Sequence, residues 1–175
     1  YNGYLDQEEM ESQQILTNKV KLALGLLSEQ QCQCVVLYTF QSLSYQDIAE
    51  ELLLDYDQVR GSISHGRKKL KWLMTVSEDE PAFNMDEETV QKIVQSIGIH
   101  DKDKILNAKI INTALLLLTE QESKCFVAHY INQLSLLEMM KRFNQKNVSN
   151  QLLAAQKSIK SMLNTYIQIQ TRYYG

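Results

Sequence analysis

The feature that most constrains the fold of this 175-residue chain is an internal repeat. Residues 23–30 (ALGLLSEQ) align with residues 114–121 (ALLLLTEQ), and apolar positions continue to coincide along both segments. Because a repeated segment folds into the same supersecondary unit twice, the sequence predicts two similar helical units, the second shorter near its middle. Chance similarity between two leucine-rich helical stretches is the alternative. Further matched pairs are Cys34/Cys125, Val36/Val127, Leu43/Leu134, Ser44/Ser135, Val59/Val148, Ile63/Leu152, Gly66/Ala155, Leu70/Ile159 and Leu73/Met162.

Composition favours an all-α fold. The chain contains only one proline and six glycines, whereas β-strands are usually bounded by turn residues of these types. Hydrophobic residues make up 44% of the chain, which is enough to form a packed core. The net charge of −3 argues against a protein that binds polyanions over its whole surface. Any nucleic-acid contact therefore has to come from a local basic surface.

Capping signals divide the first copy into four expected helices, over residues 18–27, 29–41, 45–53 and 58–74. Asp57 is positioned to cap the fourth helix, whose residues Val59, Ile63, Leu70 and Leu73 follow the helical period and predict a buried face. Two pairs have the spacing of a capping box, and both recur in the second copy. The pairs are Ser28 with Gln31, Ser44 with Asp47, Thr119 with Glu122, and Ser135 with Glu138.

The segment between the copies, residues 75–107, is acidic, because eight acidic and three basic side chains give it a net charge of −5. Pro81 breaks the chain just after the first copy. A helix is expected from Asp86 to Ile97, where apolar residues recur at helical spacing and Gly98 follows at a stop position. The expected organisation is an acidic N-terminal segment (1–17), a helical domain (18–74), an acidic linker with one helix (75–107) and a second, degenerate helical domain (108–175).

The third and fourth expected helices have a helix-turn-helix pattern, a short helix and a longer one joined by a tight turn. Residues 57–71 contain five basic residues and one acidic residue, a net charge of +4. A charged helix face is often only a solvated face, but in this architecture it favours DNA binding. The exposed side of the fourth helix is expected to carry Gln58, Arg60, Ser62, Ser64, His65, Arg67, Lys68 and Lys71.

Three motifs resemble region four of bacterial RNA polymerase sigma factors, most closely the extracytoplasmic-function class. They are residues 24–31 (LGLLSEQQ), 43–52 (LSYQDIAEEL) and 59–70 (VRGSISHGRKKL). The resemblance implies that residues 58–74 form a recognition helix that enters the major groove of a −35 promoter element. It implies DNA contacts from Ser44, Tyr45, Gln58, Arg60, Gly61, Ser62, Ser64, His65, Arg67, Lys68 and Lys71.

The resemblance also implies a protein partner, because the family binds the flap of the polymerase β subunit through the first helices of this domain. That partner surface would lie near residues 22–36. The sequence departs from the family at the turn, where Leu53 replaces a glycine, and at Gly61 and Ser62, which replace serine and arginine and remove one expected DNA contact. No segment resembles sigma region two, so we do not expect a complete sigma factor.

The second copy departs further from the family pattern. Met140 stands where the first copy has Ala49, and Asn144 is suited to the left-handed conformation that a shortened turn requires. One interpretation is a second DNA surface made by Lys146, Ser149, Asn150 and Lys157. The other is a degenerate repeat that packs against the first copy or another subunit, and a homodimer stays open.

No catalytic site is expected, because His65, His100 and His129 have no Cys, Asp or Glu partner at metal-ligand spacing and no glycine-rich phosphate loop is present. Cys32, Cys34 and Cys125 imply no disulfide framework, and Cys34 and Cys125 are expected in the core. The longest apolar run, residues 114–118, is too short to span a membrane. We expect a cytoplasmic, DNA-binding transcription regulator without metal or cofactor. The alternative is an adaptor that uses the same fold to bind polymerase or another regulator.

Overall fold

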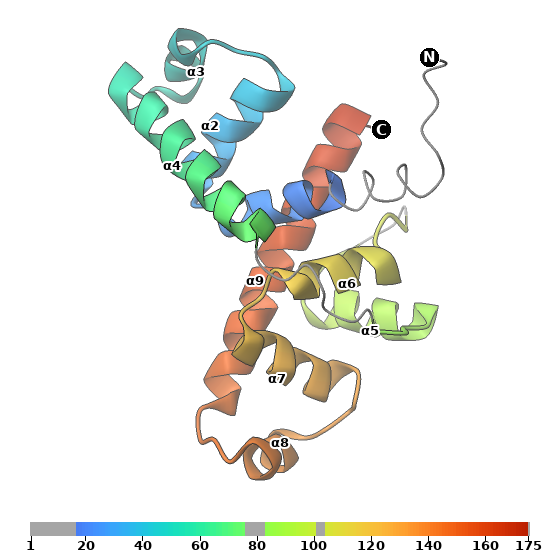
Figure 1. Ribbon diagram of the computed structural model, residues 1–175. Helices are drawn as coiled ribbons and strands as arrows, with labels where there is room; N and C mark the ends of the chain where they lie inside the picture. Colours follow the sequence, from blue (N-terminus) through green and yellow to red (C-terminus); the bar gives the residue numbers. More distant parts are fainter. Residues whose placement is uncertain (1–16, 76–82, 101–103, 175) are drawn as a thin grey trace, which may run out of the picture.

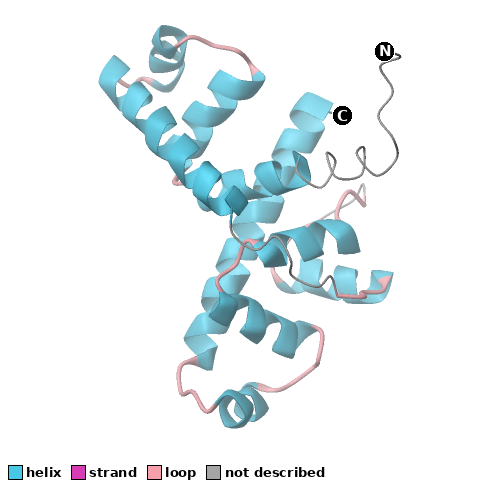
Figure 2. Cartoon of the chain, viewed as in Figure 1, coloured by secondary structure: helices cyan, strands magenta, loops and turns pink. Residues whose placement is uncertain are grey.

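The computed structural model describes residues 17–75, 83–100 and 104–174, and every regular element in these residues is helical (Figure 2). The all-α prediction is therefore confirmed for the described part of the chain. The acidic segment 1–17 lies outside it except for Thr17, and so do Pro81 and the linker residues 78–80 and 101–103. None of the described helices is long and apolar enough to cross a membrane.

The first unit contains the four helices that the sequence predicts, with small shifts at their ends. A helix through residue 23 continues as the 3₁₀ turn η1 (Leu24–Leu26), followed by α2 (Glu29–Phe40), α3 (Tyr45–Leu52) and α4 (Tyr56–Thr75). Ser28 Oγ accepts a hydrogen bond from the Gln31 N–H at 3.2 Å, and Ser44 Oγ accepts one from the Asp47 N–H at 3.1 Å. Each cap satisfies an amide that the start of a helix leaves without an intrahelical partner.

The start of α4 differs from the prediction, because Asp55 caps it and Asp57 does not. Asp55 Oδ1 accepts from the Gln58 N–H at 2.8 Å, and Gln58 Oε1 accepts from the Asp55 N–H at 3.0 Å. This reciprocal pair is a capping box in which Asp and Gln replace the usual Ser and Glu. Asp57 instead lies in the first turn of α4 with an exposed side chain.

The turn between α3 and α4 passes through Leu53, whose backbone is left-handed (φ 57°, ψ 44°). The following amide, of Leu54, donates to the Ala49 carbonyl at 3.0 Å and closes the end of α3. The Leu53 side chain is 90% exposed. Because its packing offsets almost none of the steric cost of this conformation, the turn holds Leu53 under strain.

The second unit repeats this order of helices. It contains α6 (Ala108–Leu116), α7 (Glu120–Tyr130), α8 (Leu136–Phe143) and α9 (Val148–Ile169), which continues as the π-helical turn η2 (Gln170–Tyr174). The capping boxes predicted at Thr119 and Ser135 are both complete. Asn144 is left-handed (φ 50°, ψ 42°) at the position equivalent to Leu53, as predicted.

Backbone hydrogen bonds outside the helices also recur at matched positions of the two units. Ser42 lies two residues before Ser44, the cap of α3, and Gln133 lies two residues before Ser135, the cap of α8. Their φ angles are 55° and 58°. The sequence repeat is therefore accompanied by the same local backbone geometry. The matched N–H to C=O pairs are Leu27 to Leu24 with Leu118 to Leu115, and Leu43 to Leu37 with Leu134 to Ala128.

Helix α5 (Glu87–Ser96) lies where the linker helix was expected. Asp86 Oδ1 caps it by accepting from the Thr89 N–H at 2.8 Å, and Gly98 follows with φ of 80°, so both predicted ends are confirmed. Unlike a helix in an exposed linker, however, α5 buries its apolar face in the protein core. Ile93 and Val94 are at most 1% exposed and belong to the same core as α6 and α9.

The two helix-turn-helix lobes lie at opposite ends of the molecule, and α9 runs from one toward the other (Figure 1). Each lobe has a small core of its own, around Ile48 in the first and Met139 in the second. The larger central core joins α5, α6, α9 and the first helix. Contact there is close, since a Cβ on Gly25 would stand 2.6 Å from the Cα of Met162. The two units are therefore packed against each other.

Candidate nucleic-acid interface

Helix α4 is held against α2 by the apolar stripe that the sequence predicts. Val59 is fully buried and Ile63 is 1% exposed. Gly66 lets the two helices approach, since a Cβ there would stand 2.9 Å from Cγ2 of Val35. These contacts fix which side of α4 faces away from the protein.

Ser62 was predicted on the exposed side of α4, and this prediction is wrong. Its side chain is buried against α2, where Oγ accepts a hydrogen bond from Gln30 Nε2 at 2.8 Å. Position 62 directly precedes Ile63 and lies beside the apolar stripe, so a small hydroxyl fits at the edge of the helix contact. In this structure Ser62 orients α4 and does not belong to its outer surface.

The outer face of α4 carries four cationic side chains. Arg60, Arg67, Lys68 and Lys71 are all exposed, and their spacing places them on one side of the helix together with Ser64. From Arg60 to Lys71 the helix rises about 16 Å. That length is comparable to the width of the DNA major groove, about 12 Å. A row of this length can reach from base edges to the flanking phosphates.

Arg60 is paired within its own helix. Its Nη2 lies 3.2 Å from Oδ1 of Asp57, and the two side chains are 63% and 81% exposed. Ion pairs this exposed contribute at most about 1 kcal/mol, so an incoming phosphate or guanine edge can replace the carboxylate. Asp57 therefore orients Arg60 and also places a negative charge within the cationic row.

Lys69 belongs to the same basic run but points elsewhere. Its ammonium donates a hydrogen bond to the Leu26 carbonyl at 2.8 Å, across to η1. This contact satisfies a carbonyl at the end of the first helix, as basic side chains commonly do. Of the five basic residues in residues 57–71, four lie on the outer face and one ties α4 to the first helix.

The remaining predicted contacts fall into two groups. Gly61 and His65 lie on the outer half of α4, and no atom lies within 4 Å of a Cβ built on Gly61. Ser44 and Gln58 are exposed, but their side chains already cap α3 and α4. Tyr45 is half-buried, its ring 5.3 Å from that of Tyr38 and 5.8 Å from that of Tyr56. Ser44, Gln58 and Tyr45 therefore support the helix-turn-helix, and each of them is still partly exposed to solvent.

Two exposed aromatic side chains extend the outer face and were not predicted. Tyr56 opens α4 and is 49% exposed, and Trp72 near its end is 62% exposed. Trp72 lies outside the stripe of buried positions, which is the signal that identifies it as a surface residue. Planar side chains at both ends of a cationic row suit contacts with sugars and phosphates.

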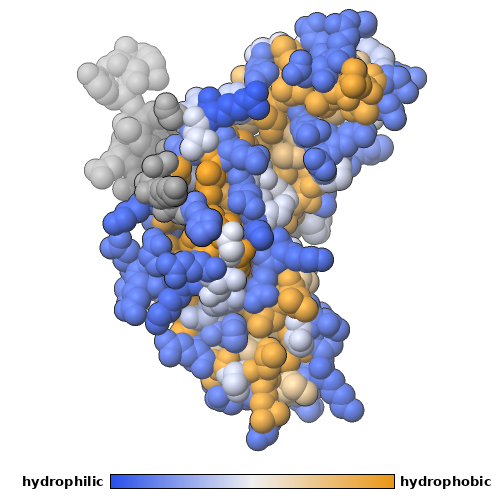
Figure 3. Space-filling model, turned by 180° about the vertical axis from the view of Figure 1, so that it is seen from behind, coloured by the Kyte–Doolittle hydropathy of each residue, from blue (hydrophilic) through white to orange (hydrophobic). Residues whose placement is uncertain are grey.

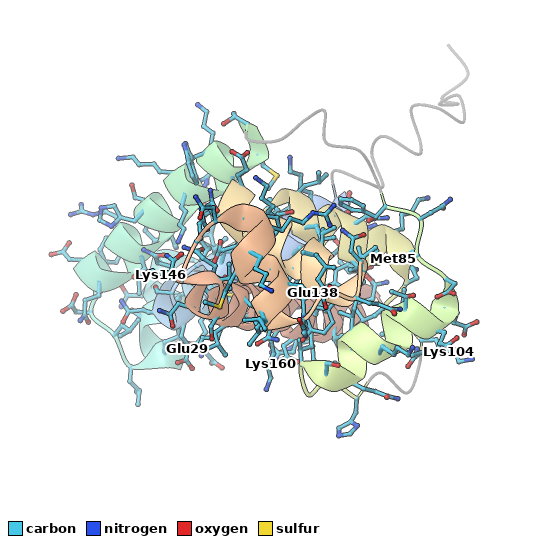
Figure 4. The ribbon with its side chains drawn as sticks, turned by 90° about the horizontal axis from the view of Figure 1, so that it is seen from below. Glu29, Met85, Lys104, Glu138, Lys146 and Lys160 are labelled. Carbon is cyan, nitrogen blue, oxygen red and sulfur yellow. The ribbon has the colours of Figure 1, made fainter. Side chains whose placement is uncertain are left out.

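The second predicted DNA surface is exposed but is mixed with apolar side chains. Lys146, Ser149, Asn150 and Lys157 all reach solvent around the start of α9. In the view from below, Lys146 lies on the side of the molecule away from α5, whereas Lys160 lies beside the end of α5 (Figure 4). The same lobe exposes Leu136, Leu137, Met140 and Leu153 by 37% to 63%. Figure 3 shows apolar surface over this lower lobe.

The partner surface implied near residues 22–36 is largely buried within the chain itself. Leu22 is fully buried, Leu24 is 1% exposed and Val35 is 3% exposed. The first helix packs along α9, and Ile169 at the end of α9 closes the space between η1 and α2. The apolar composition of this segment is thus explained by internal packing.

The cysteines take the core positions that the sequence predicts. Cys34 is fully buried and Cys125 is 1% exposed, while Cys32 is half-buried. Burial raises the pKa of all three thiols, and a hydrogen bond from the Ser62 side chain partly opposes this shift in the pKa of Cys34. Among the described residues, no three His, Cys, Asp or Glu side chains are grouped to hold a metal ion.

Comparison with known families identifies the segment that carries this face. Residues 17–70 match the family described as Sigma-70, region 4, which covers the first helix, α2, α3 and most of α4. No curated protein and no solved structure matches the chain. The matched segment is therefore a sigma region-four helix-turn-helix, a domain type that binds DNA and RNA polymerase in transcription.

Proposed function

We propose that this chain is a sequence-specific transcription regulator that contacts promoter-type DNA through α4. The observation that carries the proposal is the row of four exposed cations on the outer face of the helix that a sigma region-four domain uses as its recognition helix. Arg60 would read a guanine edge, and Arg67, Lys68 and Lys71 would contact phosphates. The proposal includes no catalytic activity and places the protein in the cytoplasm.

The overall net charge of −3 does not oppose this proposal, because charge acts locally at salt concentrations where the Debye length is about 8 Å. Residues 57–71 have a net charge of +4, and the acidic residues of the linker lie elsewhere in the sequence. The protein would approach DNA through this one face.

The test is a duplex selected from a random DNA pool at low salt, followed by binding measurements over a salt series. With three phosphate contacts, the logarithm of the association constant should fall with a slope of about −3 against the logarithm of salt concentration. Lys68→Ala should reduce this slope by about one, and Arg60→Ala should weaken binding by about 1–3 kcal/mol and relax sequence preference.

Lys69→Ala is the matched control, since it removes the same charge from the neighbouring position, whose side chain faces η1. It should leave the salt slope of DNA binding unchanged. The proposal fails if no duplex is retained at low salt, or if Lys68→Ala and Lys69→Ala change the slope equally.

The second candidate function is an adaptor that uses the sigma-like fold to bind RNA polymerase or another regulator. It is favoured by the second unit, which we propose is a divergent copy of the first. There Leu136, Leu137 and Leu153 are exposed at positions where the first unit has Tyr45, Gln46 and Ser64. Polymerase capture that survives Arg60→Ala with Lys68→Ala would favour the adaptor. Loss of capture in that double variant would favour the DNA-dependent role.

A further inference from the structure

The C-terminal end of the described chain covers the groove between α2 and α3 of the first unit, with a cavity of about 270 Å³ remaining between them. We call this the covered groove. Ile169, at the end of α9, is 2% exposed and packs against η1 and α2. Four residues later, Tyr173 stacks on Phe40 with the ring centroids 5.2 Å apart, and its hydroxyl accepts a hydrogen bond from Gln41 Nε2 at 3.3 Å. The first unit therefore holds a helix through two large side chains on one face, four residues apart.

The second unit has the corresponding groove between α7 and α8, and no helix of the described residues covers it. We call this the open groove. A cavity of about 610 Å³ lies there. Val127 and Phe143 line it at the positions that Val36 and Leu52 occupy in the covered groove. Its floor includes Leu115 and Leu118, which match the leucines that cover Ile169 in the first unit, Leu24 and Leu27.

Phe83 also lines this α7–α8 groove, and it is held there by α6. Its N–H donates to Asn112 Oδ1 at 3.0 Å, and its carbonyl accepts from Asn112 Nδ2 at 2.8 Å. Asn112 stands at the position equivalent to Lys21, whose ammonium donates to Gln170 Oε1 at 3.0 Å in the first unit. The same position in each unit thus anchors the segment that enters the groove. Besides α6, α7, α8 and the turns that join them, Phe83 is the only described residue that lines the open groove.

The helices that form the two grooves differ in charge at matched positions. The covered groove is lined by Glu51 of α3 and, from the helix that covers it, by Arg172 of η2, which has the opposite charge. In the open groove Arg142 stands at the position of Glu51, and Lys124 stands at that of Gln33. Glu120, at the start of α7, also lines this groove, so its described lining has two basic residues and one acidic residue. The Lys124 ammonium lies 5.6 Å from the centre of the Phe143 ring, so the positive charge is placed at the groove wall.

The change from Glu51 to Arg142 indicates which kind of helix the α7–α8 groove can bind. The C-terminal end of a second copy of this chain would bring Arg172 against Arg142, and like charges at an interface oppose association. An acidic residue at the position of Arg172 would complement Arg142 and Lys124 instead. We propose that the α7–α8 groove binds an amphipathic helix of a partner protein, with two large apolar side chains four residues apart and an acidic side chain between them.

The test uses the full chain and two fluorescent helical peptides. One has the sequence of residues 163–174 (LNTYIQIQTRYY), and the other differs from it only by R172E. The R172E peptide should bind about tenfold more tightly than the parent peptide, because it exchanges a repulsive pair for an attractive one. Arg142→Glu in the protein should invert this preference.

Lys141→Glu is the matched control, since it makes the same charge change at an exposed neighbour on α8 that does not line the groove. It should leave the ratio of the two affinities unchanged. Equal binding of both peptides, no binding of either, or equal effects of the two protein variants would overturn the proposal. Residues Glu78, Asp79 and Glu80 precede Phe83 in the sequence. If the R172E peptide binds only after these three are changed to glutamine, the groove belongs to the chain's own acidic segment and the partner proposal is overturned.

The α7–α8 groove is separate from the outer face of α4, so the two proposals succeed or fail independently. Loss of DNA binding in Lys68→Ala has no bearing on peptide binding, and Arg142→Glu leaves the α4 cations in place.

Discussion

Replacing Leu53 by glycine should stabilise the protein, although leucine is much the larger apolar residue. The backbone of Leu53 is left-handed, with φ 57° and ψ 44°. This conformation brings the Cβ of an L-residue close to the following carbonyl oxygen, whereas glycine adopts it without such contact. The helix-turn-helix requires the left-handed turn at this point, so the strain remains in the native state.

The magnitude follows from the exposure of the side chain and the backbone angles. With 90% of Leu53 exposed, truncation sacrifices only about a tenth of the roughly 1.5–3 kcal/mol that full burial of leucine contributes. Relief of the left-handed strain contributes about 1–2 kcal/mol. The greater conformational freedom of glycine in the unfolded chain lowers the unfolding free energy by about 0.5–1 kcal/mol. The expected net gain in unfolding free energy is about 0.5 kcal/mol.

The assay is urea unfolding followed by circular dichroism, with the slope of the transition checked for constancy. Leu53→Ala is the control, because it removes the same exposed side chain but keeps the Cβ, and its unfolding free energy should stay close to that of the parent. In the second unit, Asn144→Leu should lower the unfolding free energy, since asparagine tolerates the same angles better than leucine does. If Leu53→Gly and Leu53→Ala shift the midpoint equally, the argument from backbone strain is refuted.

Three further predictions concern the helix packing, the charged face and a buried lysine. Gly66→Ala should destabilise the protein by about 1–3 kcal/mol, because a Cβ there stands 2.9 Å from a Val35 methyl carbon. Gly61→Ala, in open space on the same helix, should stabilise it by up to about 1 kcal/mol in the same unfolding assay. Asp57→Asn should raise DNA affinity about two- to fivefold in an anisotropy titration, because it releases Arg60 and removes a negative charge from the cationic row; equal or weaker binding would contradict this role. Burial lowers the pKa of Lys21 below its ordinary value of 10.5, so the unfolded chain binds more protons there and stability rises with pH as Lys21 loses its charge. The unfolding free energy of the parent should therefore rise relative to that of Lys21→Met as the pH approaches 10.5. A difference between the two proteins that does not change with pH would refute the lowered pKa of Lys21.

Local features of the fold could be predicted because they depend on residues close in sequence. The capping boxes at Ser28, Thr119 and Ser135 each join a side chain to an amide three residues away. The stripe through Val59 and Ile63 likewise repeats with the period of a single helix. Such signals need no knowledge of distant packing, so they identified the helices and, apart from Ser62, the exposed side of α4.

Errors at single positions arose where two local readings compete. Asp55 and Asp57 are both suited to cap a helix, and the choice depends on which one finds a reciprocal partner, here Gln58. Ser62 lies at the border between the buried and exposed sides of α4, and its place was decided by Gln30 on α2. A helical period assigns the centre of each face reliably but leaves its edges to the neighbouring helix.

Long-range packing within the chain could not be predicted from the sequence pattern or from the family resemblance. Residues 22–36 are apolar on more than one side, which the resemblance explained by a partner protein. In this chain α9 and its extension cover that surface, with Ile169 against η1 and α2 and Ser161 hydrogen-bonded to the Gly25 carbonyl. A second unit in the same chain can supply intramolecularly what a partner supplies to a single unit, and at a far higher effective concentration. A protein that binds the first unit through this surface therefore has to displace the end of α9, whereas the α7–α8 groove of the second unit presents the same kind of surface without that competition.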